Sequence, residues 1–461
     1  MRYRLTQPLQ TQYTCLTFEF AGSDIPVNAI EVALKSTLIV DPSSRERPET
    51  RAVPNQHKTS RTRFAVDRMM LILCLWSVPI SIAVAELFLS LALGVRILRI
   101  IRREVRVQLP ACFRFWLVWA ASALVVWTQS PEPALGWSEI RHMLLIGAVV
   151  LVLPVLAGIS DRLTAWKGIL VTSAISSLSL IGEFVWRGVH YQREISAGGD
   201  VGFYLRSGGV LHHWMVYGTV ETIVLAGLVG FWTLYREEHR RWWPVVAITL
   251  TAIVLSLTRM VWLTCILILV IDMVWRRSKW LWALPLLPFA LYVLAPASVR
   301  SRIAISSDPA YYSNFERLQM LRVGWQMVRE HPLTGIGPGR VDKVYTSYLA
   351  PQDPIPAYHG HLHNNVAQIA AQFGIPVTLA AIVFVAALFR DLLQARKTAR
   401  TRDERFLVHT GILALIGFVF AGLFEYTYGH SLALILLCFA VLPIRFPVAP
   451  EDCEIQARPG D

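Results

Sequence analysis

Charged residues are scarce in this chain. They make up 16% of its 461 residues, whereas 54% are hydrophobic, and soluble domains rarely combine these two values. Windows of about 20 apolar residues recur between positions 69 and 446, and that length crosses the core of a bilayer. The composition therefore excludes an ordinary soluble domain and predicts an all-α polytopic membrane protein.

Cysteine is scarce too, and its placement excludes two stabilising devices. Four of the six cysteines lie in apolar runs and two in polar tails, and no pair has the spacing of metal ligands: Cys74, Cys112, Cys265, Cys438, Cys15 and Cys453. We expect neither a disulfide framework nor a structural zinc site. The chain also lacks the internal repeat that marks many transporters.

The N-terminal residues lack the apolar core of a signal sequence. Residues 1–67 are polar and rich in Arg, Thr, Ser and Pro, which predicts a disordered cytoplasmic tail. Alternatively, translation begins near Met69 or Met70, where the membrane pattern starts abruptly. Residues 447–461 are expected to form a second cytoplasmic tail.

Basic residues set the expected topology, because Lys and Arg are retained in cytoplasmic loops. The net charge of +12 is thereby explained without nucleic acid. We expect about 12 transmembrane helices: helices 1–9 in residues 68–297, one large periplasmic loop at 298–362, and helices 10–12 in residues 363–446. The first two would break near Pro79.

This topology places two arginines on the outer side, and because basic residues are usually retained in the cytoplasm, their position needs an explanation. Arg259 interrupts the apolar stretch 244–275, and an arginine near the bilayer core costs at least ~2.5 kcal/mol on insertion scales. It therefore requires an anion or a water-filled cavity, unless it only reaches to the external interface. Arg206 precedes a helix that Ser207 could cap, and a helix N-terminus beside an arginine suits phosphate. A solvated loop arginine is the competing interpretation.

The large loop contains a second helical pattern. Leu318, Leu321, Trp325 and Val328 recur at helical spacing, which predicts an amphipathic helix that lies on the membrane or packs on the bundle. Arg317 lies at the edge of this stripe, where it could bind a lipid headgroup. A solvated face is equally consistent with the spacing.

Alternating histidines end the loop. His359, His361 and His363 could converge on a metal ion, but no acidic residue follows in a metalloprotease frame, so we expect no metal. His363 precedes Asn364 at the mouth of a helix, where an imidazole serves as an interfacial polar group or as a general base. Glu425 could orient it.

Nearby, His212 and His213 are expected to be polar lining of the same cleft.

Taken in order, these motifs resemble one family. The set comprises Leu-Arg-Ser-Gly before a helix, Thr-Arg in a middle helix, Glu-Arg, Pro-Leu-Thr-Gly-Ile-Gly-Pro-Gly from Pro332, and His-Asn with Gly374 after nine intervening residues. It resembles the O-antigen ligase and polymerase superfamily of bacterial membrane glycosyltransferases over residues 69–446. Val377 and Met260 depart from the pattern, because a small or hydroxylated residue and a glycine are expected there.

The resemblance implies a glycosyltransferase C-like bundle in the bacterial inner membrane with a periplasmic active site. An O-antigen ligase of lipopolysaccharide biosynthesis transfers polysaccharide from undecaprenyl pyrophosphate to a sugar hydroxyl of lipid A-core, with inversion and without metal or cofactor. Carried onto this chain, His363 would be the base, and Arg206 and Arg259 would bind the pyrophosphate. Substrate-binding roles would fall to Arg317, Asn364, His361, His359 and Glu425.

Other functions stay open at this point. An O-antigen polymerase would use a second lipid-linked glycan as acceptor, and a protein O-oligosaccharyltransferase would use a serine. A lipid-linked glycan transporter would need charges along a path through the bundle, whereas here the arginines gather on one side. The glycan structure, the acceptor sugar and the oligomeric state are not encoded in any motif of the sequence.

Overall fold

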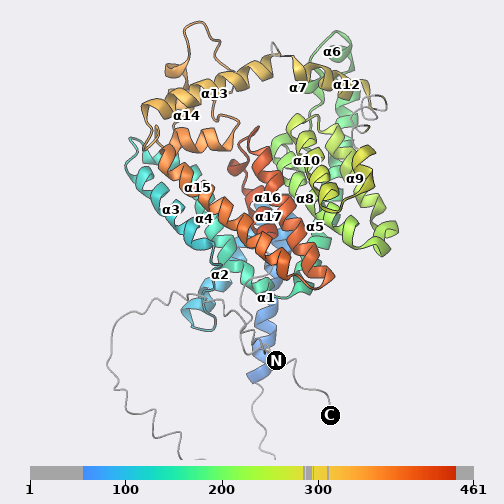
Figure 1. The fold of residues 1–461 in the computed structure, drawn as a ribbon, viewed down its shortest axis with the longest axis vertical. Helices are drawn as coiled ribbons and strands as arrows, with labels where there is room; N and C mark the ends of the chain where they lie inside the picture. The colour runs from blue at the N-terminus through green and yellow to red at the C-terminus, as the bar shows by residue number, and fades with distance from the viewer. Residues whose placement is uncertain are drawn as a thin grey trace, which may run out of the picture. The chain divides into compact units, whose positions relative to one another are not determined.

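The computed structural model describes residues 56–283, 286, 293, 295–308, 311–356 and 358–442. Within these residues every regular element is helical (Figure 1). The long helices are α1 (Gln56–Ser77), α2 (Ile82–Ile101), α3 (Phe113–Thr128), α4 (Trp137–Val152), α5 (Ile159–His190), α8 (Trp214–Leu234), α9 (His239–Leu255), α10 (Arg259–Trp275), α13 (Tyr312–Glu330), α15 (Asn365–Thr398), α16 (Arg402–Ala421) and α17 (Ser431–Val441). Four short helices join them: α6 (Gln192–Ser196), α7 (Val201–Leu205), α12 (Ala297–Ala304) and α14 (Val341–Val344). The packing described below lies within the compact unit that begins at Thr62.

The described helices agree with a multi-pass membrane protein. Five helical segments are long and apolar enough to cross a membrane: Pro133–Leu156, Ile159–His190, Trp214–Leu234, Asn365–Thr398 and Arg402–Ala421. The apolar helices α3 and α17 are shorter. A total of about 12 crossings stays a prediction, and the last of the nine helices expected in residues 68–297 falls mostly outside the described residues.

The N-terminal end differs from the expectation of a tail up to residue 67. Helix α1 begins at Gln56, and Asp67 on it is buried and accepts a hydrogen bond of 2.5 Å from Arg99 of α2. An ion pair between residues 32 positions apart in the chain is invisible to local hydropathy. The chain does turn near Pro79, between α1 and α2, as predicted. The tails at 1–55 and 447–461, and a start at Met69 or Met70, are not tested by the described residues.

Helix α8 is the centre of the bundle. Nearly all of its residues from Met215 to Phe231 are buried, as expected for a helix that is apolar on all sides. Small residues let its neighbours approach closely: a Cβ on Gly227 would lie 2.6 Å from Trp166, and one on Gly230 would lie 2.5 Å from Thr410. Such close backbone packing holds membrane helices together where burial from water supplies no driving force.

A break in α15 explains the glycine-rich motif of the loop. Gly374 has φ +80°, which interrupts the helix, and the N–H of Ile375 donates to Pro332 O at 2.8 Å. A second hydrogen bond connects the same two segments in the other direction, because Ile336 N–H of the turn donates to Ala371 O of α15 at 2.8 Å. The turn that begins at Pro332 and Gly374 therefore form one interlocked unit beneath the candidate site.

The predicted helix in the loop exists as α13, and most of its predicted apolar stripe does not pack on the bundle. Leu318, Leu321 and Trp325 are 52%, 40% and 67% exposed, whereas Met320, Val323 and Met327 are buried against a small core that includes Leu362 and Tyr345. Only Val328 of the predicted stripe is buried. The helix carries two apolar stripes at the same period, and packing against α15 decides which one is covered.

Candidate active site

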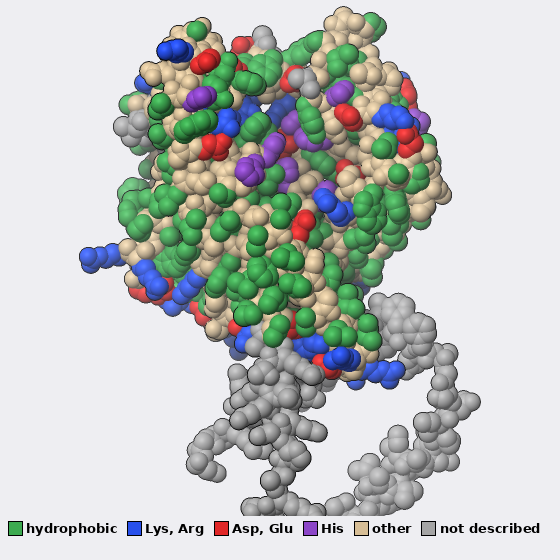
Figure 2. All heavy atoms as spheres, turned by 180° about the vertical axis from the view of Figure 1, so that it is seen from behind, with side chains coloured by type: hydrophobic (Ala, Val, Ile, Leu, Met, Phe, Trp, Pro, Cys, Tyr) green, Lys and Arg blue, Asp and Glu red, His purple; other side chains and the backbone are tan. Residues whose placement is uncertain are grey.

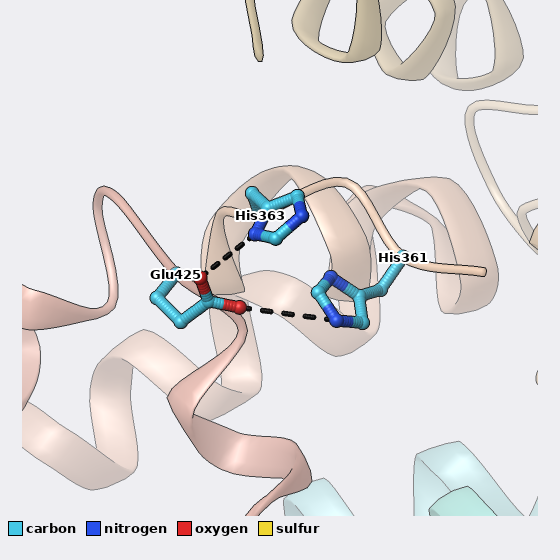
Figure 3. A group of neighbouring side chains, drawn as sticks. All are labelled: His361, His363 and Glu425. Carbon is cyan, nitrogen blue, oxygen red and sulfur yellow. Dashed lines mark hydrogen bonds and ion pairs between the residues drawn. The ribbon is translucent and has the colours of Figure 1, made fainter. Parts of the chain in front are cut away.

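A histidine and a glutamate form the centre of the site. His363 has φ +48°, a rare conformation for a residue with a side chain, and it directly precedes the helix cap Asn364. Its Nδ1 lies 2.7 Å from Oε2 of Glu425, which follows α16 (Figure 3). Glu425 is 1% exposed. A backbone strained in this way commonly marks a functional position.

The start of α15 is joined to the segment that carries Glu425. Asn364 caps the helix by accepting from Ala367 N–H at 2.9 Å, and its Nδ2 donates to Leu423 O at 2.9 Å. The N–H of Asn365 donates to Gly422 O at 2.7 Å. These bonds fix the separation of His363 and Glu425. Asn364 thus joins the start of α15 to the segment after α16, and a role in substrate binding stays a prediction.

The charge of Glu425 sets the tautomer of His363. Burial would raise the pKa of Glu425, but the charge and hydrogen bond of His363, with His361 and Arg317, outweigh it and lower the pKa to about 2. The carboxylate therefore accepts the Nδ1 proton, and Nε2 is the ring nitrogen of His363 that Glu425 does not engage. This is the arrangement of a general base held by an acidic partner.

His361 stands beside the pair in the neutral form. Burial and the neighbouring His363 lower the pKa of His361 to about 4. Its ring lies edge-on to His363, with centroids 4.3 Å apart, and its Nε2 is 3.8 Å from Oε1 of Glu425 (Figure 3). The donor atoms of His361, His363 and Glu425 lie within 4.8 Å of one another, a set that suits zinc.

Two features of this group oppose metal binding. The His363 Nδ1–Glu425 hydrogen bond occupies the atoms that a metal ion would need. A guanidinium nitrogen of Arg317 also lies 3.7 Å from the same carboxylate oxygen, where a second cation would be repelled. The arrangement found is an acid–base pair.

Tyr426, the residue after Glu425, is held by a buried hydrogen-bond network. Its hydroxyl donates to Glu139 of α4, and Gln372 of α15 donates to the same carboxyl group at 3.3 Å. All three side chains are buried. This hydrogen-bond network connects α4 and α15 to Tyr426, and so fixes the position of the backbone next to Glu425.

Four arginines gather next to this pair: Arg206, Arg259, Arg302 and Arg317. Burial, followed by the charge of Arg302, lowers the pKa of Arg206 to about 10, so these two guanidinium groups are close enough to repel each other. Arg302 is buried, donates to Tyr311 Oη at 2.8 Å and lies 5.5 Å from the Tyr311 ring. Across the described residues, neither Arg206 nor Arg259 has an ion pair with a carboxylate. Positive charge without its own counter-ion is what an anionic ligand requires.

His213 connects the two groups. Burial lowers the pKa of His213, and the charges of Glu425, Arg206 and His363 all act on it, so it lies between the arginines and the base. Figure 2 shows histidine side chains gathered in the upper part of this face, with basic and acidic side chains among them, and further basic side chains along its lower end.

The O-antigen ligase family model matches residues 244–382. Over these residues the chain is similar to the O-antigen ligase family. The match runs from α9 into α15 and contains Arg259, Arg302, Arg317 and His363, while Arg206 and Glu425 lie outside it. No curated protein matches the chain. A membrane environment, as expected for this family, agrees with the five helical segments that are long and apolar enough to cross a membrane.

Some of the predicted residues lie outside this group. His359 pairs with Asp342 at 3.1 Å and contacts the Tyr345 ring, so it is not part of the group around Glu425. Ser207 does not cap α8, because its hydroxyl donates to Glu183 of α5. The helix is capped by His213, whose Nδ1 accepts from Met215 N–H at 3.2 Å.

Arg302 is the residue that sequence reasoning missed. It lies in the loop expected on the outer side, so the argument applied to Arg206 and Arg259 could have found it. The sequence does not separate it from Arg300, which is exposed, because only packing buries one of the two.

Proposed function

We propose that the protein is an O-antigen ligase, which transfers a polysaccharide from undecaprenyl pyrophosphate to a sugar hydroxyl of lipid A-core in the bacterial inner membrane. The observation that carries the proposal is the adjacency of a base, His363 held by Glu425, to an arginine cluster. A base and an anion site side by side are what inverting transfer from a diphosphate requires.

The reaction follows from these groups. The pyrophosphate binds to Arg206, Arg259 and Arg302, which stabilise its developing charge in place of a divalent ion. Nε2 of His363 takes the proton of the acceptor hydroxyl, and the oxygen attacks the anomeric carbon from the face opposite the leaving group. The new carbon–oxygen bond forms as the bond to undecaprenyl pyrophosphate breaks, so the configuration inverts.

Glu425 and Arg317 complete the proposed site. Glu425 keeps the Nδ1 proton in place and stabilises the imidazolium that forms. Arg317 forms an ion pair with the same carboxylate at 3.7 Å and lies within reach of the charge of Arg302, so it would link the base to the donor. No metal or cofactor enters this scheme.

A periplasmic site is part of the proposal. The helices that start at the candidate site, α8 and α15, end near the basic residues Arg236, Arg396 and Arg405. Arginines in short connections are retained in the cytoplasm, so the site would face the opposite side.

In-vitro transfer tests the function. Purified protein, undecaprenyl-pyrophosphate-linked glycan and lipid A-core are combined with EDTA present, and glycosylated lipid A-core is measured. We expect product with wild type and with His359→Ala, which alters a histidine outside the group around Glu425, and none with His363→Ala. Full activity in His363→Ala would overturn the base role.

The same assay separates the alternatives. Elongated lipid-linked glycan without lipid A-core product would make the protein a polymerase, and a glycosylated protein acceptor would make it an O-oligosaccharyltransferase. An unconsumed donor would favour the transporter.

A further inference from the structure

A cavity of about 590 Å³ lies at the far end of the bundle from the candidate active site. Helix α8 starts just after His213 and α10 starts at Arg259, and both end at the cavity, which is lined by Leu234 and Trp275. In Figure 1, α15 likewise runs diagonally from the site side toward the opposite end. The cavity therefore belongs to a second location and not to the transfer site.

The lining of this cavity is strongly basic. It contains Arg236, Arg276, Arg396 and Arg405, together with His409. The buried Asp272 beside it is already compensated, since it pairs with Arg276 and with His409, the latter at 2.9 Å.

The remaining arginines have no such compensation. In the part of the chain that the structure describes, Arg236, Arg396 and Arg405 form no ion pair with a carboxylate. The acidic residues near them in sequence have other partners. Glu237 pairs with Arg402, and Asp403 accepts from the Tyr235 hydroxyl. Glu404 accepts from the backbone N–H groups of Arg400 and Thr401. Three guanidinium groups around one cavity leave net positive charge that only an external anion can balance.

The position of the cavity across the membrane indicates the source of such an anion. A helix of 21 residues such as α8 is about 30 Å long at 1.5 Å per residue, which is the thickness of the hydrocarbon core. If the active site lies at one headgroup layer, the cavity lies at the other. Trp275, with Arg396 stacked 4.4 Å from its ring, is the kind of aromatic residue found at that level.

We infer that this cavity binds the phosphate group of an anionic ligand, with an anionic phospholipid headgroup as its source. Its volume is far larger than one phosphate ion needs and leaves room for a glycerol backbone. Basic pockets between membrane helices bind phospholipid headgroups through the same contacts. The inference does not depend on the transfer reaction.

Lipid binding to the purified full-length protein tests this site. The protein in neutral detergent is titrated with dioctanoyl phosphatidylglycerol and, separately, with dioctanoyl phosphatidylcholine, and the bound lipid is counted by native mass spectrometry. We expect at least tenfold tighter binding of the anionic lipid. The variant Arg396→Gln/Arg405→Gln should lose that preference.

The matched control removes the same charge elsewhere. Arg102→Gln/Arg106→Gln alters two exposed arginines outside the cavity and should bind like wild type. Equal affinity of wild type for both lipids, or wild-type binding by the Arg396/Arg405 variant, would overturn the site. Should that variant fail to fold, Arg396→Lys/Arg405→Lys keeps the charge, and the comparison of the two lipids on wild type still decides.

A third titration with glycerol 1-phosphate distinguishes the sources. Binding as tight as that of the lipid would assign the cavity to a soluble phosphate compound and overturn the lipid source. Binding at least tenfold weaker would show that the acyl chains contribute, in support of a lipid.

Discussion

Nδ1 of His363 and Oε2 of Glu425 are 2.7 Å apart, although 62 residues separate them in the chain. His363 precedes the start of α15 and Glu425 follows the end of α16, and these two helices pack side by side. Hydrogen bonds between the start of α15 and residues 422–428 hold the two ends together. The base is thus oriented by packing between helices, and its strength depends on residues that never meet the substrate.

Glu425→Gln tests that orientation. Glutamine keeps the shape but cannot hold the Nδ1 proton as a carboxylate does, so we expect kcat for glycan transfer to fall by about 100-fold or more. The KM for the lipid-linked donor should change little. Glu194→Gln, an exposed carboxylate on α6, is the control and should leave both constants unchanged. A Glu425→Gln enzyme with wild-type kcat would refute the role.

The neutral state of His361 predicts a pH dependence of stability. The pKa of His361 is lowered from the ordinary 6.5 to about 4. Between pH 6.5 and pH 4 this side chain is therefore protonated in the unfolded chain and neutral in the folded protein. Stability should therefore fall as the pH drops from 6.5 to 4. His361→Asn removes this contribution, and its Tm in detergent should fall less over that range than that of wild type. Parallel Tm curves would contradict the prediction.

Glu425 extends the loss to lower pH. Because its pKa is depressed to about 2, its contribution is complete above the unfolded value near 4.5 and is lost as the pH falls toward 2. The Tm of Glu425→Gln should be less sensitive than that of wild type between pH 4.5 and 3. Circular dichroism melts of both proteins across this range measure the difference.

Arg302 should matter for donor binding although the sequence did not single it out. Arg302→Gln removes a buried guanidinium that acts on Arg206, Arg259 and Arg317. We expect the KM for the lipid-linked donor to rise about tenfold, consistent with the loss of one charge-assisted contact of about 1.4 kcal/mol. Arg300→Gln alters an exposed neighbour and should keep the wild-type KM. Equal KM values for the two variants would rule out the role.

Gly374 should be essential for the break in α15. A Cβ at this position would lie 2.3 Å from Leu333 O, and φ +80° adds about 1–2 kcal/mol of strain for any other residue. Gly374→Ala should therefore lower Tm strongly. Gly94→Ala in α2 is the matched control, because a Cβ there has nothing within 4 Å, and helix propensity favours alanine by about 1 kcal/mol. Similar Tm values for both variants would show that the break is not required.

Several parts of this protein were predictable because they depend on local composition. Apolar windows predicted membrane helices, and the cost of an outward arginine singled out Arg206 and Arg259. The His-Asn motif placed a candidate base at the mouth of a helix, and the ordered motifs pointed to the superfamily that the match to residues 244–382 supports. Each of these signals lies within one short stretch of chain.

Tertiary structure decided the rest, because it depends on pairs that are far apart in sequence. Packing on α15 chose the buried face of α13, and Glu183 of α5 took the hydroxyl of Ser207 that could otherwise have capped a helix. The same packing buried Arg302, left Arg300 exposed, and brought the arginines of three helices around one cavity. A sequence fixes which side chains exist and the period of their pattern. Only the folded chain decides which face is covered and which charge lacks a partner.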